Sequence, residues 1–164
     1  MREELLIIVT GGTLDKVHDT FAEALAFDPN GKSHMPEILA SARCHFPQTQ
    51  LIFLKDSLDF TDEDRAFIKA EICNATEEAI VLTHGTGTMA QTACFLADQQ
   101  IEKTIVLTGA IRPYSFAGSD AQFNLGGAVI AAQTLPHGVW AIMNGRVFPA
   151  DRVKKDVQSG RFDL

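Results

Sequence analysis

Five short apolar runs recur along the chain, and each is followed by a turn signal. A strongly β-favouring run at residues 5–10 is closed by Gly11-Gly12, and residues 79–82 are soon followed by His84-Gly85. Uninterrupted apolar runs of this length are typical of strands that are buried on both faces, as in a parallel sheet. The five predicted strands are residues 5–10, 51–54, 79–82, 104–108 and 139–143.

Helical patterns alternate with these runs. The clearest begins at Thr61, a capping hydroxyl followed by Asp62 and Glu63, and the Ala-rich pattern of residues 121–134 ends before Pro136. The predicted helices are residues 36–44, 61–74, 88–99 and 121–134, while residues 146–157 are polar and short of helix signals. This alternation predicts an α/β fold: a three-layer α/β/α, open, mostly parallel and Rossmann-like sheet in one domain over residues 1–164.

Composition narrows the function classes. Lys and Arg number 14 against 21 Asp and Glu, a formal charge of −7, so we expect no nucleic-acid partner and no anionic membrane partner. No stretch approaches the roughly 20 apolar residues of a membrane span. Cys44, Cys73 and Cys94 lie at wide spacings in helical patterns, and we expect buried free thiols. These features predict a cytoplasmic protein.

The candidate chemistry lies in the loops that follow the predicted strands, where open α/β sheets bind ligands. These loops combine glycines, which let backbone N–H groups approach a ligand, with the hydroxyls of Thr13, Ser57, Thr86 and Thr88. Together they predict a site for a small anionic ligand, although each fragment alone is also a common turn. His84, beside a strand end, is expected to be a hydrogen-bonded structural histidine. With no dinucleotide fingerprint, P-loop or metal-ligand motif, we expect no cofactor and no metal.

Taken together, the motifs resemble the bacterial-type L-asparaginase/glutaminase family. The first strand leads into TGGT, a later one into THGTGTMAQTA, and the next carries VLTGAIRPYSFAGSDAQFNL. In the family these read TGGTI, a THGTDTMEETA-like stretch and GAMRP…DGPFNL, in the same order and at similar spacing. The Ser57-Leu58-Asp59 turn resembles the family's Ser-Gln-Asp substrate turn. The segment from Met143 to Lys155 resembles the one that bears the family's catalytic lysine.

The resemblance implies an amidohydrolase that converts the side-chain amide of asparagine, or of a related small amide, to the acid and ammonia. Thr13 is then the nucleophile, Thr86 the second catalytic threonine and Lys155 its base or proton-relay partner. Ser57 would hold the substrate α-carboxylate, and Asp59 belongs to the same turn. The backbones of Gly12, Gly85 and Gly87 complete the predicted substrate-binding set.

Three departures from the family pattern keep alternatives open. Gly87 replaces the aspartate that binds the substrate α-amino group in the family. The family's lid tyrosine has no counterpart after TGGT, where Asp15 is a candidate to replace the lost carboxylate, and Tyr114 lies in another loop. The family's smaller C-terminal domain, which closes a neighbour's site, has no counterpart here, so we expect a homo-oligomer. A catalytically impaired ligand-binding or regulatory domain, and a generic α/β binding module, are the alternatives to a hydrolase.

Overall fold

Five parallel strands and one antiparallel strand form the central sheet of the computed structural model, which describes residues 4–162. The strand order is β4-β1-β5-β6-β7-β8, and β8 alone runs antiparallel, against β7. The strands are β1 (Leu5–Gly11), β4 (Gln48–Lys55), β5 (Ala79–Thr83), β6 (Thr104–Thr108), β7 (Gly138–Met143) and β8 (Arg146–Pro149). The predicted parallel core of five strands is confirmed, and so is the α/β class.

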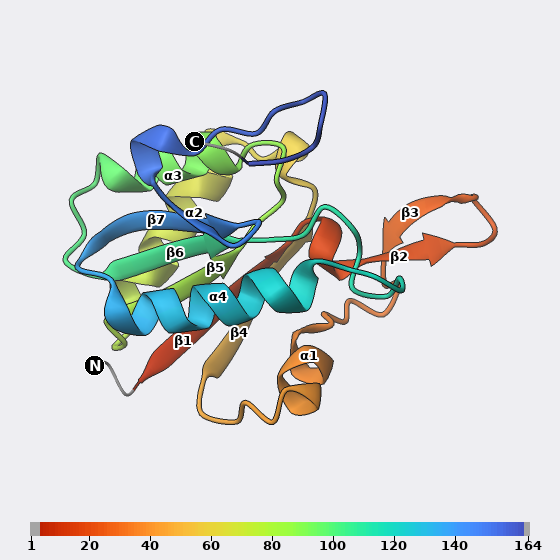
Figure 1. Cartoon of the computed structure of the whole chain (residues 1–164), viewed down its shortest axis with the longest axis horizontal. Helices are drawn as coiled ribbons and strands as arrows, with labels where there is room; N and C mark the ends of the chain where they lie inside the picture. Colours follow the sequence, from red (N-terminus) through yellow and green to blue (C-terminus); the bar gives the residue numbers. More distant parts are fainter. Residues whose placement is uncertain (1–3, 163–164) are drawn as a thin grey trace.

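Helices cover both faces of this sheet, which makes three layers (Figure 1). The alternation of side chains along β1 shows why: Leu6 and Ile8 pack with α2 (Asp62–Asn74) and α3 (Met89–Ala97). Leu5, Ile7 and Val9 point to the other face, where they pack with α1 (Met35–Ser41) and α4 (Ala121–Thr134). Because β4 and β5 both pair with β1 in parallel, the C-terminal ends of these three strands lie at the same edge of the sheet.

Two features of the chain were not predicted. Strand β8 lies within residues 146–157, where no strand was predicted, and only Phe148 of its four residues is buried. Strands β2 (Lys16–Asp19) and β3 (Ala24–Phe27) pair only with each other, and this hairpin projects from the body of the molecule (Figure 1). None of its eight strand residues is fully buried, so no regular alternation of buried and exposed positions marked it in the sequence.

The prediction of three buried thiols was wrong. Cys73 and Cys94 are exposed, and Cys44 is half-buried and lies beyond the end of α1. Successive helical residues are about 100° apart around the axis, so a cysteine next to a core residue can face solvent. Ile72 and Ala93 take the buried positions beside Cys73 and Cys94.

Helix α2 begins as the sequence predicts. The Thr61 hydroxyl accepts a hydrogen bond from the Asp64 amide, and the Asp64 carboxylate in turn accepts one from the Thr61 amide, which makes a capping box.

Within residues 4–162, no helix is both long enough and apolar enough to cross a lipid bilayer.

Candidate active site

The turns after β1 and β5 are in direct contact. Gly12 has a φ of 76°, and a Cβ added there would lie 2.5 Å from the backbone nitrogen of Gly85. A residue with a side chain would therefore separate the two turns, which is the physical reason for glycine at position 12. Thr13 and Thr86 follow these glycines directly, so chain connectivity holds their Cα atoms no more than about 12 Å apart.

Ser57 joins the same surface from β4. It opens the 3-10 turn Ser57–Asp59 and is almost fully buried. Its Oγ accepts a hydrogen bond from the Thr88 amide at 3.3 Å, while the Thr88 hydroxyl donates to the Ser57 carbonyl at 2.7 Å. A Cβ at Gly85 would lie 2.5 Å from the Ser57 Oγ. Three loops from distant parts of the chain thus adjoin at Gly12, Ser57 and Gly85.

Lys155 reaches the site from the far end of the chain. Its Nζ donates a hydrogen bond of 2.9 Å to the Thr86 Oγ1 across 69 residues of sequence, and the Thr86 side chain is buried. An antiparallel bridge to Phe162 holds the Lys155 backbone in place. Phe162 is itself buried, and its amide donates to the Asn144 Oδ1 at 2.9 Å. The lysine is therefore carried by an anchored segment.

Other predicted residues are less closely engaged. Thr13 is half-buried, and its hydroxyl has no hydrogen-bond partner among residues 4–162. Asp59 is exposed, and its carboxylate forms no hydrogen bond or ion pair with any described residue. The Tyr114 amide donates to the Leu14 carbonyl at 3.2 Å, but its hydroxyl donates to Glu37 at 3.3 Å. The sole tyrosine is thus committed to a contact with α1.

Gly87 is exposed beside Leu58. A Cβ at Gly87 would lie 2.7 Å from the Leu58 Cδ2 and 3.4 Å from the Ser57 Oγ. The Leu58 side chain is 73% exposed, so it is free to move aside. An apolar side chain therefore stands next to the position at which the family pattern has a carboxylate.

Asp15 does not fit the role of replacement carboxylate. Its Oδ1 accepts hydrogen bonds from the Ser33 hydroxyl at 2.8 Å and the His34 amide at 2.7 Å. Burial raises the pKa of Asp15, against the lowering effect of these two hydrogen bonds. Its one contacted oxygen is thus already occupied, and the buried group favours its neutral form more than an exposed carboxyl does.

Ion pairs flank the Ser57 turn. Lys16 pairs with Asp56, and Lys55 pairs with Asp64 at 2.6 Å. Partial burial would raise the pKa of Asp56, but the Lys16 ammonium and the Leu58 amide outweigh it and hold that pKa below its usual value. These cations are therefore committed to carboxylates, whereas Lys155 meets a hydroxyl.

His84 is hydrogen-bonded and buried, as predicted for a structural histidine. Its Nδ1 lies 2.7 Å from the Gly85 carbonyl, and its Nε2 lies 2.8 Å from the Thr92 Oγ1. Thr92 in turn accepts from the Arg65 Nε at 3.2 Å. Sequence reasoning missed Arg65 and Thr92, because an arginine just after the acidic first turn of a helix looks solvated. Nothing in the local pattern indicates that its side chain turns inward.

Across the described part of the chain, no group of three or more His, Cys, Asp or Glu side chains is placed to hold a metal ion. The arrangement is instead one of hydroxyls, one amine and closely packed glycine turns at the C-terminal edge of a parallel sheet. The fold is that of the three-layer α/β proteins, in which ligands bind at this edge of the sheet.

Comparison with known proteins identifies the family. The family model described as "Asparaginase, N-terminal" matches residues 4–163, and the chain belongs to the asparaginase family. The L-asparaginase I of Vibrio cholerae superposes with a TM-score of 0.82 at 27% identity, covering 99% of this chain and 51% of that one. The glutaminase-asparaginase of Pseudomonas aeruginosa is 28% identical over an alignment that covers 93% of this chain and 45% of the relative.

A shorter match is closer in sequence. The probable periplasmic L-asparaginase of Haemophilus influenzae is 40% identical over 87 residues, which cover 51% of this chain and 25% of the relative. The chain thus spans about half the length of the relatives that it matches nearly end to end. The resemblance inferred from the motifs is confirmed at the level of family and fold.

Proposed function

We propose that this chain carries an amidohydrolase site of the asparaginase type, which converts the side-chain amide of asparagine or a related small amide to the acid and ammonia. The observation that carries the proposal is the 2.9 Å hydrogen bond from the Lys155 Nζ to the Thr86 Oγ1. A hydroxyl paired with an amine is the arrangement that moves a proton during nucleophilic catalysis. Thr86 lies on the turn after β5, and this turn contacts the turn that carries Thr13.

In the proposed reaction the Thr13 oxygen attacks the amide carbon, and its proton passes to the leaving nitrogen. The carbon–nitrogen bond breaks, ammonia leaves and an acyl ester of Thr13 remains. Water then hydrolyses the ester and restores the hydroxyl. Lys155 relays a proton through Thr86 and returns it, because threonine and water are weak nucleophiles unless a neighbouring group assists them.

Substrate binding is assigned to the surrounding loops. Ser57 donates to the substrate carboxylate, with Asp59 at the end of the same turn. The backbones of Gly12, Gly85 and Gly87 allow close approach of the ligand, and loop N–H groups are suited to stabilise a developing oxyanion. The proposed chemistry uses these groups and water.

A second candidate function is a ligand-binding domain without turnover. The observation that favours it is the contact between Gly87 and Leu58, since no carboxylate stands at that position to hold a substrate ammonium. Losing a charged contact to a buried ammonium costs about 2–5 kcal/mol. The same contact would also suit hydrolysis of an amide that lacks a free α-amino group. The absence of a carboxylate at position 87 therefore fits either a binding domain or a hydrolase with a different amide substrate.

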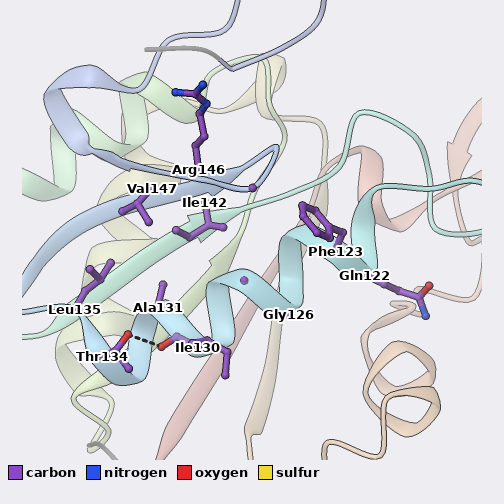
Figure 2. Close-up of a pocket in the computed structure, with 12 residues that line it drawn as sticks. Gln122, Phe123, Gly126, Ile130, Ala131, Thr134, Leu135, Ile142, Arg146 and Val147 are labelled. Carbon is purple, nitrogen blue, oxygen red and sulfur yellow. Dashed lines mark hydrogen bonds between the residues drawn. The ribbon is translucent and has the colours of Figure 1, made fainter.

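Self-association is part of the proposal. Helix α4 has no charged residue in its 14 positions, although Phe123 and Ile130 are 69% and 63% exposed. A groove of about 640 Å³ lies between α4 and the β7–β8 turn. Figure 2 shows its lining residues, with Phe123 near one end and Leu135 near the other. Exposed apolar surface of this kind supports contact with a second copy. Light scattering at micromolar concentration should show a dimer or larger species, and a monomer would contradict it.

The proposal also takes residues 1–164 as one N-terminal-type domain of the family and places the protein in the cytoplasm. The cysteines support this compartment: Cys44, Cys73 and Cys94 are all free, and two of them are exposed. Exposed unpaired thiols are typical of reducing compartments.

Ammonia release from asparagine, glutamine and succinamate under single-turnover conditions tests the function. Thr13→Ala should lower the rate at least a hundredfold, because it removes the nucleophile. Thr20→Ala, an exposed threonine at the tip of the β2–β3 hairpin, is the matched control and should leave the rate unchanged. Ammonia release that survives Thr13→Ala would end the catalytic reading. Tight binding of an amide without any ammonia would favour the ligand-binding alternative.

A further inference from the structure

Arg65 is an unusual buried residue. It is 7% exposed, and its guanidinium donates to neutral acceptors: the Thr61 carbonyl at 3.3 Å, the Gln91 Oε1 at 3.1 Å and the Thr92 Oγ1 at 3.2 Å. Among the described residues the one carboxylate within ion-pair distance is Asp62, at 3.5 Å, and that side chain is 98% exposed and screened by water. Burying a charge without a buried counterion is costly, so the fold maintains this arginine at some expense.

The donors in this chain of hydrogen bonds follow from the groups that can only donate or only accept. A guanidinium only donates, so the Thr92 oxygen accepts from the Arg65 Nε. The Gly85 carbonyl only accepts, so the His84 Nδ1 carries a proton and donates at 2.7 Å. In a neutral ring the His84 Nε2 is then unprotonated, and it accepts from the Thr92 hydroxyl. All bonds run in one direction, from Arg65 to the Gly85 carbonyl.

The electrostatics agree with this assignment. Burial lowers the pKa of His84 from 6.5 to about 4, and the nearby charge of Arg65 also lowers it, against the raising effect of the Gly85 carbonyl. His84 is therefore neutral near pH 7. A neutral imidazole has one donor and one acceptor, which are the two groups that the chain of hydrogen bonds requires.

The last bond of the chain sets the orientation of the Gly85–Thr86 peptide. In a planar trans peptide the C=O and the following N–H point in opposite directions. His84 holds the Gly85 carbonyl toward the buried side, so the Thr86 N–H is directed away from it. That N–H donates to no acceptor within residues 4–162. It lies on the turn that contacts Gly12 and Ser57, on the same residue as the hydroxyl bound by Lys155.

We propose that Arg65, Thr92 and His84 are positioning residues that lock the Gly85–Thr86 peptide, so that the Thr86 N–H stays available to an oxygen of the bound ligand. The assignment of that oxygen to the reacting amide rests on the proposed function. None of the three residues touches the substrate. Their role is to keep a backbone donor fixed, since preorganised donors stabilise developing negative charge without reorganising during the reaction.

The tautomer of His84 tests the lock without any substrate. A two-dimensional ¹⁵N-edited NMR spectrum of the imidazole groups, with His84 identified by the signal missing from His84→Gln, should show a protonated Nδ1 and an unprotonated Nε2. The state should persist from pH 8 to pH 5. A protonated Nε2, or a charged ring at pH 7, would overturn the proposal in the wild-type protein itself.

Thr92→Val tests the consequence, because it removes the hydroxyl that links Arg65 to His84. It should lower kcat for ammonia release at least tenfold while KM changes by less than about threefold, since removing one oxyanion donor costs about 10²–10³ in kcat and this change only loosens one. Thr92→Ser keeps the hydroxyl and should restore kcat. Thr104→Val removes another buried threonine hydroxyl, bound to the Leu135 carbonyl, and should leave kcat unchanged.

A folded Thr92→Val protein with wild-type kcat would refute the lock. If no protein in the series releases ammonia, the proposed function has failed, and the tautomer measurement still decides the lock separately.

Discussion

Replacing His84 with glutamine should remove much of the acid sensitivity of folding. The pKa of His84 is about 4 in the folded chain and 6.5 when it is unperturbed, so between these pH values the unfolded chain binds a proton that the native chain does not. Stability contributed by this site is fully present above pH 6.5 and is lost as the pH falls toward 4. This difference in pKa corresponds to a loss of about 3 kcal/mol in the free energy of unfolding well below pH 4, of which about 2 kcal/mol is lost by pH 5.

Glutamine is the appropriate replacement because its amide can donate to the Gly85 carbonyl and accept from the Thr92 hydroxyl without titrating. Urea unfolding at pH 5, 6, 7 and 8 gives the free energy of unfolding for both proteins. The difference between wild type and His84→Gln should be constant from pH 7 to 8 and change by about 2 kcal/mol at pH 5, in favour of the variant. His45→Gln, which removes a histidine from an exposed position, is the matched control. Parallel curves for wild type and His84→Gln would refute the reasoning.

Three further changes probe the site and its surroundings. Lys155→Met keeps most of the length of the side chain but removes the amine. It should lower kcat at least a hundredfold, while the Kd for aspartate, measured by calorimetry, changes by less than about threefold. Equal losses in kcat and in affinity would contradict a role in proton transfer. Gly87→Asp should raise the kcat/KM for asparagine relative to that for succinamate at least tenfold. The new carboxylate would pair with the α-ammonium of asparagine, which succinamate lacks, once Leu58 moves aside. An unchanged ratio would show that this position does not contact the ligand. Asp15→Asn should raise the free energy of unfolding at pH 7 in urea titrations. Burial raises the pKa of Asp15, so stability falls as this carboxyl ionises with rising pH, and asparagine does not ionise. A less stable variant would contradict that sign.

Much of the fold could be predicted because hydrophobic burial leaves a direct trace in the sequence. Strand β5 is buried at every position and appears as an uninterrupted apolar run. Strand β8 leaves no such trace, because it lies at the edge of the sheet and buries only one of its own side chains, that of Phe148. The hairpin of β2 and β3 is held by its own pairing and by polar contacts such as the Ser115 hydroxyl on the Lys16 carbonyl at 3.0 Å. Tertiary contacts of this kind are not visible in local patterns.

The candidate site divides in the same way. Gly12, Ser57 and Thr86 could be found because the ends of parallel strands converge, and turn residues that follow buried runs are easy to recognise. Lys155 could be found only through the family resemblance, since residues 146–157 carry no local signal. Arg65 could not be found at all. Its neighbours Asp62, Glu63 and Asp64 suggest a solvated helix start, and only the packed structure shows its guanidinium turned toward Thr92.

Trapping the acyl-enzyme intermediate tests the central claim most directly. The protein is mixed with asparagine or succinamate, quenched in acid within milliseconds to seconds and digested, and the peptides are analysed by mass spectrometry. We expect an acyl ester on the hydroxyl of Thr13, which is absent from Thr13→Ala and accumulates in Lys155→Met if deacylation becomes the slower step. Ammonia release accompanied by an acyl group on Thr86 or another residue, or by no acyl group at all, would contradict it.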